Sequence, residues 1–125
     1  MEKVVRDHKD LLVWQKAKDL VKEIYKATAG FPNAERFNLT SQMQRAAVSI
    51  PSNIAEGYMR SSRKEYVYFL AIAAGSASEL ETLTILSFEL EFLTKEQYDS
   101  INSKLSEIRR MLFAMRKKLS LNPKP

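Results

Sequence analysis

The sequence predicts an all-α protein, an antiparallel up-and-down four-helix bundle that forms a single domain over residues 1–125. Apolar residues recur at three- and four-residue spacing in four segments, at about residues 9–29, 39–58, 62–92 and 95–119, which is the period of an amphipathic helix. No segment shows the strict alternation of a half-buried strand. The connections between the segments are short, and short connections favour antiparallel neighbours.

The first two segments each carry one apolar stripe. In the first, the stripe consists of Val13, Ala17, Leu20, Ile24 and Ala27. Gly30 follows it, and glycine often ends helices because it accepts a left-handed backbone. In the second, the stripe consists of Leu39, Met43, Ala46, Ile50 and Ile54. We expect Asn38 or Thr40 to cap the start of this second helix.

Pro51 lies inside the second segment, where a proline removes one backbone hydrogen bond and costs roughly 3 kcal/mol. We expect a continuous helix that is kinked at Pro51. Ser49, Ser52 or a water would then satisfy the carbonyl of Ala47. The alternative is a true break, with Asn53 capping a short new helix.

The last two segments begin with capping boxes, Ser62 with Glu65 and Thr94 with Gln97, in which each side chain accepts a hydrogen bond from a free amide. The expected stripe of the third segment is Phe69, Ala73, Ser76, Leu80, Leu83, Ser87 and Leu90. The stripe of the fourth is Tyr98, Ile101, Leu105, Ile108, Leu112, Met115 and Leu119.

The first turns of the third segment are apolar on nearly every side, and its middle, "AAGSAS", contains only small residues. Small residues allow close packing, either within the monomer or between subunits. A helix that is apolar all round is buried on all sides, which one small bundle can hardly achieve. We therefore expect a homo-oligomer whose interface includes Tyr66, Tyr68, Ile72 and Gly75.

The composition indicates a soluble protein. There is no cysteine, which excludes disulfides and thiolate chemistry and fits a reducing compartment. The longest uncharged run, residues 66–78, has 13 residues, and we take it as too short to span a bilayer. The N-terminus is charged and does not have the apolar core of a signal peptide. We expect a cytoplasmic protein without membrane contact.

Enzymatic activity is not expected. The only histidine, His8, lies near the N-terminus, where we expect it to be solvated. A two-metal bundle needs a Glu-x-x-His motif, and the sequence contains none. There is also no phosphate-binding loop and no dinucleotide fingerprint. We expect no cofactor, no metal and no catalytic residue.

The net charge is +5, from 20 Lys and Arg against 15 Asp and Glu, and the charges are segregated. Residues 65–93 carry five glutamates and no cation, whereas residues 104–118 carry six cations and one glutamate. Such segregation can pair helices, pair subunits or leave a basic surface for phosphate. The candidate nucleic-acid contacts are Arg45, Arg60, Arg63, Lys64, Arg109, Arg110, Arg116, Lys117 and Lys118. Each could instead be solvated or paired with an acid.

Three stretches carry a resemblance to a known family: "LLVWQKAKDLVKEIYKATAGFP", "RAAVSIPSNIAEGYMRSS" and "FLAIAAGSASELETL". They resemble the bacterial four-helix-bundle family of 23S rRNA-intervening sequence proteins. The resemblance implies a ring-like pentamer. It also implies similarity to the accessory protein of diversity-generating retroelements, a basic barrel thought to bind nucleic acid and a reverse transcriptase. Gln44 stands where the family often has an arginine, and Asn38 where it usually has glycine.

The leading hypothesis is a non-enzymatic homo-oligomer, a pentamer by the resemblance, that binds nucleic acid through its basic clusters without sequence preference. Its partners would be further copies of the chain, RNA or DNA, and a nucleic-acid-processing protein. The alternative is a protein–protein interaction scaffold with no nucleic-acid role, in which the cations pair with acids of neighbouring subunits.

Overall fold

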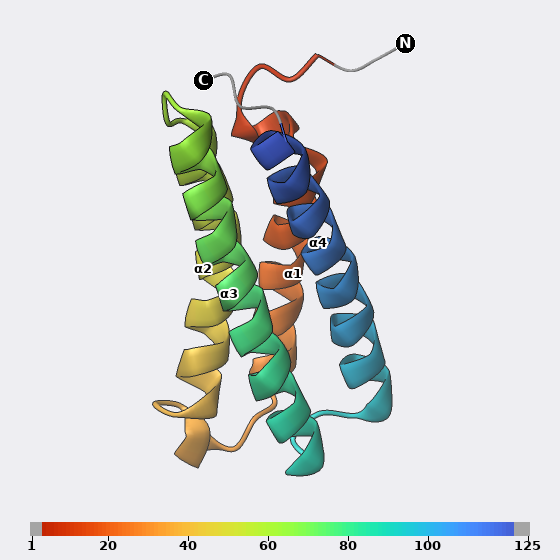
Figure 1. Cartoon of the computed structure of the whole chain (residues 1–125). Coiled ribbons are helices and arrows are strands. Elements are labelled where there is room, and N and C mark those ends of the chain that lie inside the picture. The colour runs from red at the N-terminus through yellow and green to blue at the C-terminus, as the bar shows by residue number, and fades with distance from the viewer. Residues whose placement is uncertain (1–3, 122–125) are drawn as a thin grey trace.

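The computed structural model describes residues 4–121 and forms an up-and-down bundle of four α-helices (Figure 1). The helices are α1 (Leu12–Thr28), α2 (Leu39–Tyr58), α3 (Arg63–Glu89) and α4 (Lys95–Leu121), with short 3₁₀ turns at His8–Asp10 and Asn33–Glu35. Each helix packs against the next, and α1 packs against α4, which closes the bundle. The predicted fold class is confirmed.

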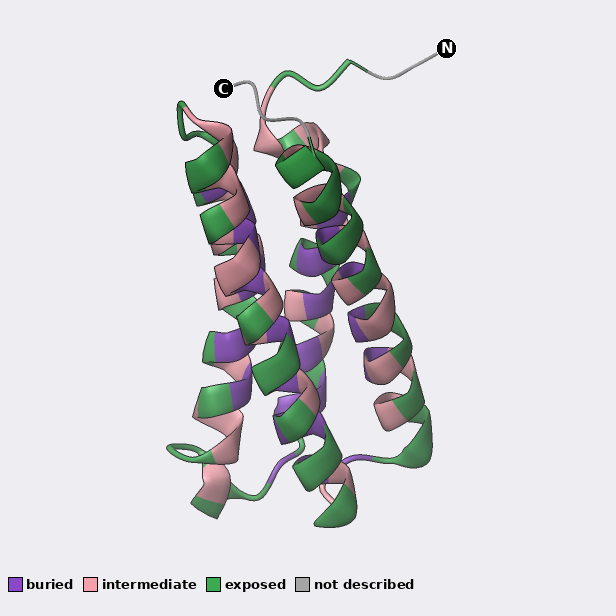
Figure 2. Ribbon diagram, viewed as in Figure 1, coloured by how far each residue is buried: buried purple, intermediate pink, exposed green. Residues whose placement is uncertain are grey.

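The predicted stripes of α1, α2 and α4 face the axis of the bundle (Figure 2), and all their members are buried except Leu39, Tyr98, Met115 and Leu119, which are half-buried. The stripe of α3 is shifted. Phe69 and Ser76 are only half-buried and Leu90 is exposed. The buried residues of α3 are Leu70, Ala73, Ala77, Leu80, Leu83, Thr84 and Ser87. The prediction was wrong here because a helix that is apolar on several sides has no distinct phase in its sequence.

The start of α4 has a complete capping box. The Gln97 amide donates to Thr94 Oγ1 at 3.1 Å, and the Thr94 amide donates to Gln97 Oε1 at 2.9 Å. At the start of α3, Ser62 Oγ accepts from the Glu65 amide at 3.2 Å and contacts the Glu65 carboxylate at 3.3 Å.

Two other predicted helix ends differ from the structure. Gly30 follows the end of α1, but its φ is not positive, so it does not form a left-handed cap. Asn38 occupies the N-cap position of α2 without a side-chain cap bond. Glu35 Oε1 accepts from the Leu39 amide instead, at 3.4 Å.

Helix α2 continues through Pro51, which excludes a break with a new helix capped by Asn53. The kink itself stays a prediction. The Ser49 hydroxyl does not turn back toward Ala47; it forms a 2.7 Å hydrogen bond with Ser76 Oγ of α3. Asn53 Nδ2 donates to Ser49 O at 2.8 Å and to Ser49 Oγ at 2.9 Å. Ser49, which Asn53 holds in place, therefore connects α2 to α3 near the proline.

The two helices approach each other closely at Gly57. A Cβ atom added there would lie 2.9 Å from Phe69 Cβ and 3.0 Å from a ring carbon of Tyr66, which is closer than real Cβ contacts. Gly57 thus acts in packing, whereas its position in the sequence indicated only a helix end.

A left-handed residue closes the C-terminal end of α3. Glu91 has a φ of 66°, and in the described chain no other residue has a positive φ. The Phe92 amide donates to Ser87 O at 2.8 Å and the Glu91 amide donates to Phe88 O at 2.9 Å, which is the Schellman arrangement. This turn places the centre of the Phe92 ring 5.6 Å from the centre of the Phe31 ring, so that Phe92 packs against the core.

Helix α3 is long and apolar enough to cross a membrane by length and composition alone, so the 13-residue run was too narrow a criterion. One such helix is weak evidence, because core helices of soluble proteins pass the same test. Only a third of its most apolar window is buried in the bundle, so much apolar surface of α3 faces outward.

We predict that Gly57→Ala destabilises the bundle by about 1–3 kcal/mol, because α2 and α3 must separate to admit the methyl group. Chemical denaturation followed by circular dichroism would measure the change. Ser52→Ala, at an exposed position of the same helix, is the control and should stay within about 0.5 kcal/mol of the wild type. Equal stability of the two variants would contradict the close approach at Gly57.

We predict that Glu91→Gly stabilises the protein by about 0.5–1 kcal/mol, because glycine adopts a left-handed backbone without steric cost. Thermal unfolding of the variant would show a higher midpoint. Glu89→Gly, at the last helical residue of α3, should instead lower it. A lower midpoint for Glu91→Gly would refute the left-handed turn.

Candidate nucleic-acid interface

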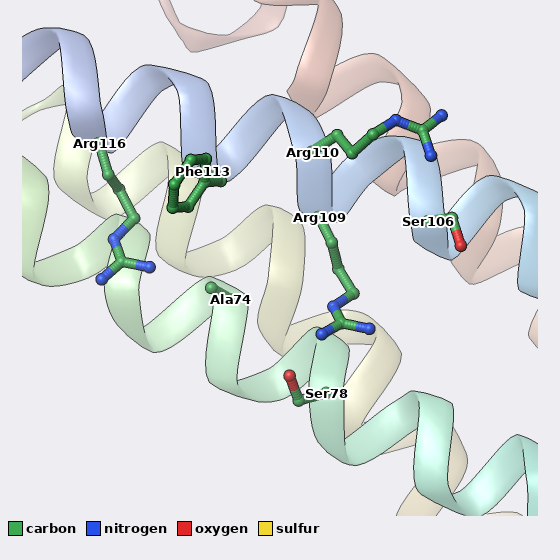
Figure 3. Close-up of a pocket in the computed structure, with 7 residues that line it drawn as sticks. All are labelled: Ala74, Ser78, Ser106, Arg109, Arg110, Phe113 and Arg116. Carbon is green, nitrogen blue, oxygen red and sulfur yellow. The ribbon is translucent and has the colours of Figure 1, made fainter.

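The main basic feature is a groove of about 650 Å³ between α3 and α4, which we call the α3–α4 groove. Its lining residues are Ala74, Ser78, Ser106, Arg109, Arg110, Phe113 and Arg116. Figure 3 shows Arg109 and Arg116 extending from α4 toward α3, with Phe113 between them, whereas the Arg110 side chain is directed away. Two guanidinium groups therefore converge on one groove, on either side of an aromatic ring that is 64% exposed.

The two converging arginines differ in their partners. Arg109 forms an ion pair with Glu81 of α3, with 2.9 Å between Nη1 and Oε2. The Nε atom of Arg116 is buried and has no hydrogen-bond acceptor within residues 4–121. A buried donor without a partner is uncommon, because its desolvation is not compensated. The Arg116 guanidinium also forms no ion pair within residues 4–121, so its charge remains available to an anion in the groove.

The remaining cations of α4 extend this surface toward the end of the helix. A smaller groove of about 230 Å³ adjoins Arg116 and Phe113 and includes Lys117. Lys117 and Lys118 are exposed, and neither has an ion-pair partner among the residues described. Cations in the last turns of a helix also interact favourably with its dipole.

The predicted cluster at the α2–α3 turn is partly used within the chain. Arg60 forms a 2.7 Å ion pair with Glu56, and its guanidinium lies 4.8 Å from the centre of the Phe69 ring. Arg63 is half-buried and interacts with other residues. Lys64 is exposed in the first turn of α3. This turn offers less available charge than the sequence indicated.

Arg45 lies apart from the other candidates. It lines a second groove, formed by the end of α1, the loop that follows and the start of α2. That groove also contains the exposed ring of Phe37 and the side chain of Arg36, two residues that the sequence analysis did not select. The dipeptide Arg36–Phe37 was the signal in the sequence that could have indicated this groove, but only the fold brings Arg45 beside it.

The four predicted interface residues do not share one environment. Tyr68, Ile72 and Gly75 lie on the outer side of α3, where Tyr68 is 61% exposed and Gly75 is also exposed. Tyr66 packs between α2 and α3, with its ring 6.0 Å from that of Tyr58. Burial, together with the nearby Tyr58, raises the pKa of Tyr66 to about 12.

The described residues do not form a metal-binding cluster. Residues 4–121 contain no group of three or more metal-ligating His, Cys, Asp or Glu side chains. His8 lies in a 3₁₀ turn with its ring 5.1 Å from that of Trp14. The expected solvation of His8 is only partial: the residue is half-buried, and its Nδ1 atom is buried with no hydrogen-bond partner in the described chain.

By its fold and its surface, the protein is a small four-helix bundle that carries basic grooves. The sequence matches the family described as 23S rRNA-intervening sequence protein over residues 9–114, and the chain belongs to this family. This agrees with the resemblance seen in the sequence.

A solved structure supports the same assignment. The chain is similar to a crystal structure of a protein of unknown function from the S23 ribosomal protein family of Bacteroides thetaiotaomicron. The two share 31% sequence identity with a TM-score of 0.77, over 85% of this chain and 99% of the other. A search of curated proteins finds no match.

Proposed function

We propose that the protein is a non-enzymatic homo-oligomer that binds the phosphate backbone of nucleic acid without sequence preference. The α3–α4 groove is the main contact, and Lys117 and Lys118 extend it. The observation that carries this proposal is the pair of guanidinium groups that line one groove, of which that of Arg116 has no ion-pair partner within residues 4–121. A phosphate oxygen is anionic and accepts hydrogen bonds from guanidinium groups strongly.

Phosphate fits the groove better than an extended acidic protein surface does. The guanidinium groups offer planar, directed donors on either side of Phe113, which suits separate phosphates along a strand. No carboxylate is among the described lining residues, and Glu81 of α3 already pairs with Arg109. Phosphate contacts of this kind position a protein on nucleic acid but read no sequence.

The scaffold alternative keeps one observation in its favour. Some cations of the chain are consumed in ion pairs between helices, for example Lys16 with Glu107 at 3.2 Å. Under this alternative the end of α4 would pair with acids of a neighbouring subunit.

Oligomer formation through the outer side of α3 is the second part of the proposal. Gly75 lies in the middle of the helix, where glycine costs about 0.5–1 kcal/mol relative to alanine. A Cβ atom added there would meet nothing within 4 Å, so the monomer does not need this glycine. Tyr68 and Leu86 expose apolar surface on the same helix. A second copy of the chain would bury the Gly75 position together with the side chains of Tyr68 and Leu86. The family resemblance favours a pentamer.

The phosphate contact is tested by charge removal. We predict that Arg116, Lys117 and Lys118 changed together to Gln weaken binding to a mixed-sequence RNA at least about tenfold at low salt. The slope of log Kd against log salt should fall by about 2, because each lost contact to a single strand removes about 0.7. Fluorescence anisotropy of labelled RNA over a salt series measures both quantities.

The matched control removes three exposed lysines of α1 (Lys18, Lys22 and Lys26, each changed to Gln), which alters the net charge equally. This control should bind within about twofold of the wild type. Equal losses in the two triple variants would show attraction to net charge without a defined surface. A wild-type protein that ignores RNA at low salt would refute the proposed function and leave the scaffold.

The oligomer is tested by mass. We predict that Tyr68→Glu and Gly75→Gln each lower the mass in solution to that of the 14.4 kDa monomer, because each places a polar side chain in the proposed interface. Light scattering measures the mass, and circular dichroism checks that the helices remain. Leu12→Glu, at an exposed apolar position of α1, should leave the mass unchanged. A monomeric wild type would contradict this part of the proposal.

A further inference from the structure

The second groove, which we call the Phe37 groove, has a volume of about 770 Å³, within the range of small-ligand sites. It is built from three parts of the chain: Tyr25 near the end of α1, Arg36 and Phe37 in the connecting loop, and the outer side of the first turns of α2. It lies at the end of the bundle opposite the end of α4 (Figure 1). It is therefore a surface separate from the α3–α4 groove.

Two aromatic rings in the Phe37 groove are accessible to a ligand. Phe37 is 82% exposed, and Tyr25 is 47% exposed. Arg36 holds its guanidinium 5.3 Å from the centre of the Phe37 ring, a cation–π contact that places a positive charge against the aromatic surface. An exposed ring beside an arginine is the arrangement on which unpaired bases stack in single-strand binding proteins.

The charge of the groove selects for an anion. Arg36 and Arg45 are both exposed, neither forms an ion pair within residues 4–121, and no carboxylate is among the lining residues. The one acid nearby in the sequence, Glu35, is directed to the Leu39 amide. A ligand that combines a flat ring with negative charge therefore complements the groove.

The polar rim favours ribose over deoxyribose. The hydroxyls of Thr40 and Ser41 line the groove. Gln44 donates its amide to Thr28 Oγ1 at 3.2 Å, so the orientation of its side chain is held and its carbonyl oxygen remains an acceptor. These groups can pair with a 2′-hydroxyl, the group by which proteins distinguish RNA from DNA.

We propose that the Phe37 groove binds one unpaired nucleotide of single-stranded RNA, with the base stacked on Phe37 and the phosphates held by Arg36 and Arg45. This inference rests on the proposed function, because it assumes that the protein meets nucleic acid. It goes beyond that function in adding recognition of an unpaired base, which the α3–α4 groove does not supply. A protein partner would leave two arginines facing a groove without a carboxylate, so RNA is the better fit.

The experiment compares three labelled strands with the same number of phosphates, about ten nucleotides long: oligouridine, oligodeoxyuridine and an abasic strand that has no bases. Anisotropy titrations give the Kd of each for the wild type and for Phe37→Ala, Phe37→Trp and Leu90→Ala. Leu90 is the control, an exposed apolar residue of α3 outside the groove.

The wild type should bind oligouridine at least about fivefold more tightly than the abasic strand, and more tightly than oligodeoxyuridine. Phe37→Ala should remove the advantage over the abasic strand and leave abasic binding unchanged. Phe37→Trp should keep that advantage, because it retains a flat ring, and Leu90→Ala should match the wild type. Because Phe37 is so exposed, these variants should keep the wild-type circular dichroism spectrum.

Several outcomes would overturn the inference. If Phe37→Ala and Leu90→Ala bind oligouridine equally, no base stacks on Phe37. Equal affinity for oligouridine and oligodeoxyuridine would refute the contact with the ribose 2′-hydroxyl. A change of oligomer mass in Phe37→Ala without a change in RNA affinity would make the groove a protein interface. Tight wild-type binding of the abasic strand with no gain from bases would refute the stacking alone, whereas no binding of any strand would refute the proposed function as well.

Discussion

The close contact between α2 and α3 is the constraint on which the rest of the bundle depends. At Gly57 the backbone of α2 lies against Tyr66 and Phe69, and near Pro51 the hydroxyls of Ser49 and Ser76 form a hydrogen bond between the two helices. Because α3 is fixed along this side, one stripe of the helix, from Leu70 to Ser87, faces the core. Its Tyr68 and Gly75 positions must then face outward. The apolar outer surface of α3 is thus a consequence of how tightly its inner side is held.

Ion pairs within the chain divide the cations of α4 into two groups. Lys104 pairs with Glu23 of α1, and Arg109 pairs with Glu81 of α3, so the middle of α4 is linked to both of its neighbours. The pairs are partly exposed, and such pairs contribute little stability each. The main effect of these ion pairs is on the electrostatic field around α4. Acids of α1 and α3 neutralise Lys104 and Arg109, and the positive charge that remains lies on Arg110 and on Arg116, Lys117 and Lys118 in the last turns.

The sequence predicted the architecture well, because three of the four stripes have a clear period and the Thr94 capping box is local. The sequence analysis failed at features that the local sequence does not determine. The phase of α3 cannot be read from a helix that is apolar on several sides. Glu91 adopts a left-handed backbone that glycine or asparagine would usually take, so it gave no signal. The Phe37 groove is assembled from α1, a loop and α2, and only the folded chain brings Arg45 beside Phe37.

Under the proposed function, the placement of the α3–α4 groove would give oligomer formation a physical role in binding. A single copy offers few available cations, and phosphate contacts of this number bind weakly at physiological salt. The outer side of α3 lies beside the α3–α4 groove, so an oligomer formed through that side would repeat the groove around one assembly. A strand held at one groove reaches the next at high effective concentration, and avidity then exceeds the affinity of any one contact. Under the proposed function, the apolar surface of α3 and the cations of α4 would therefore act together.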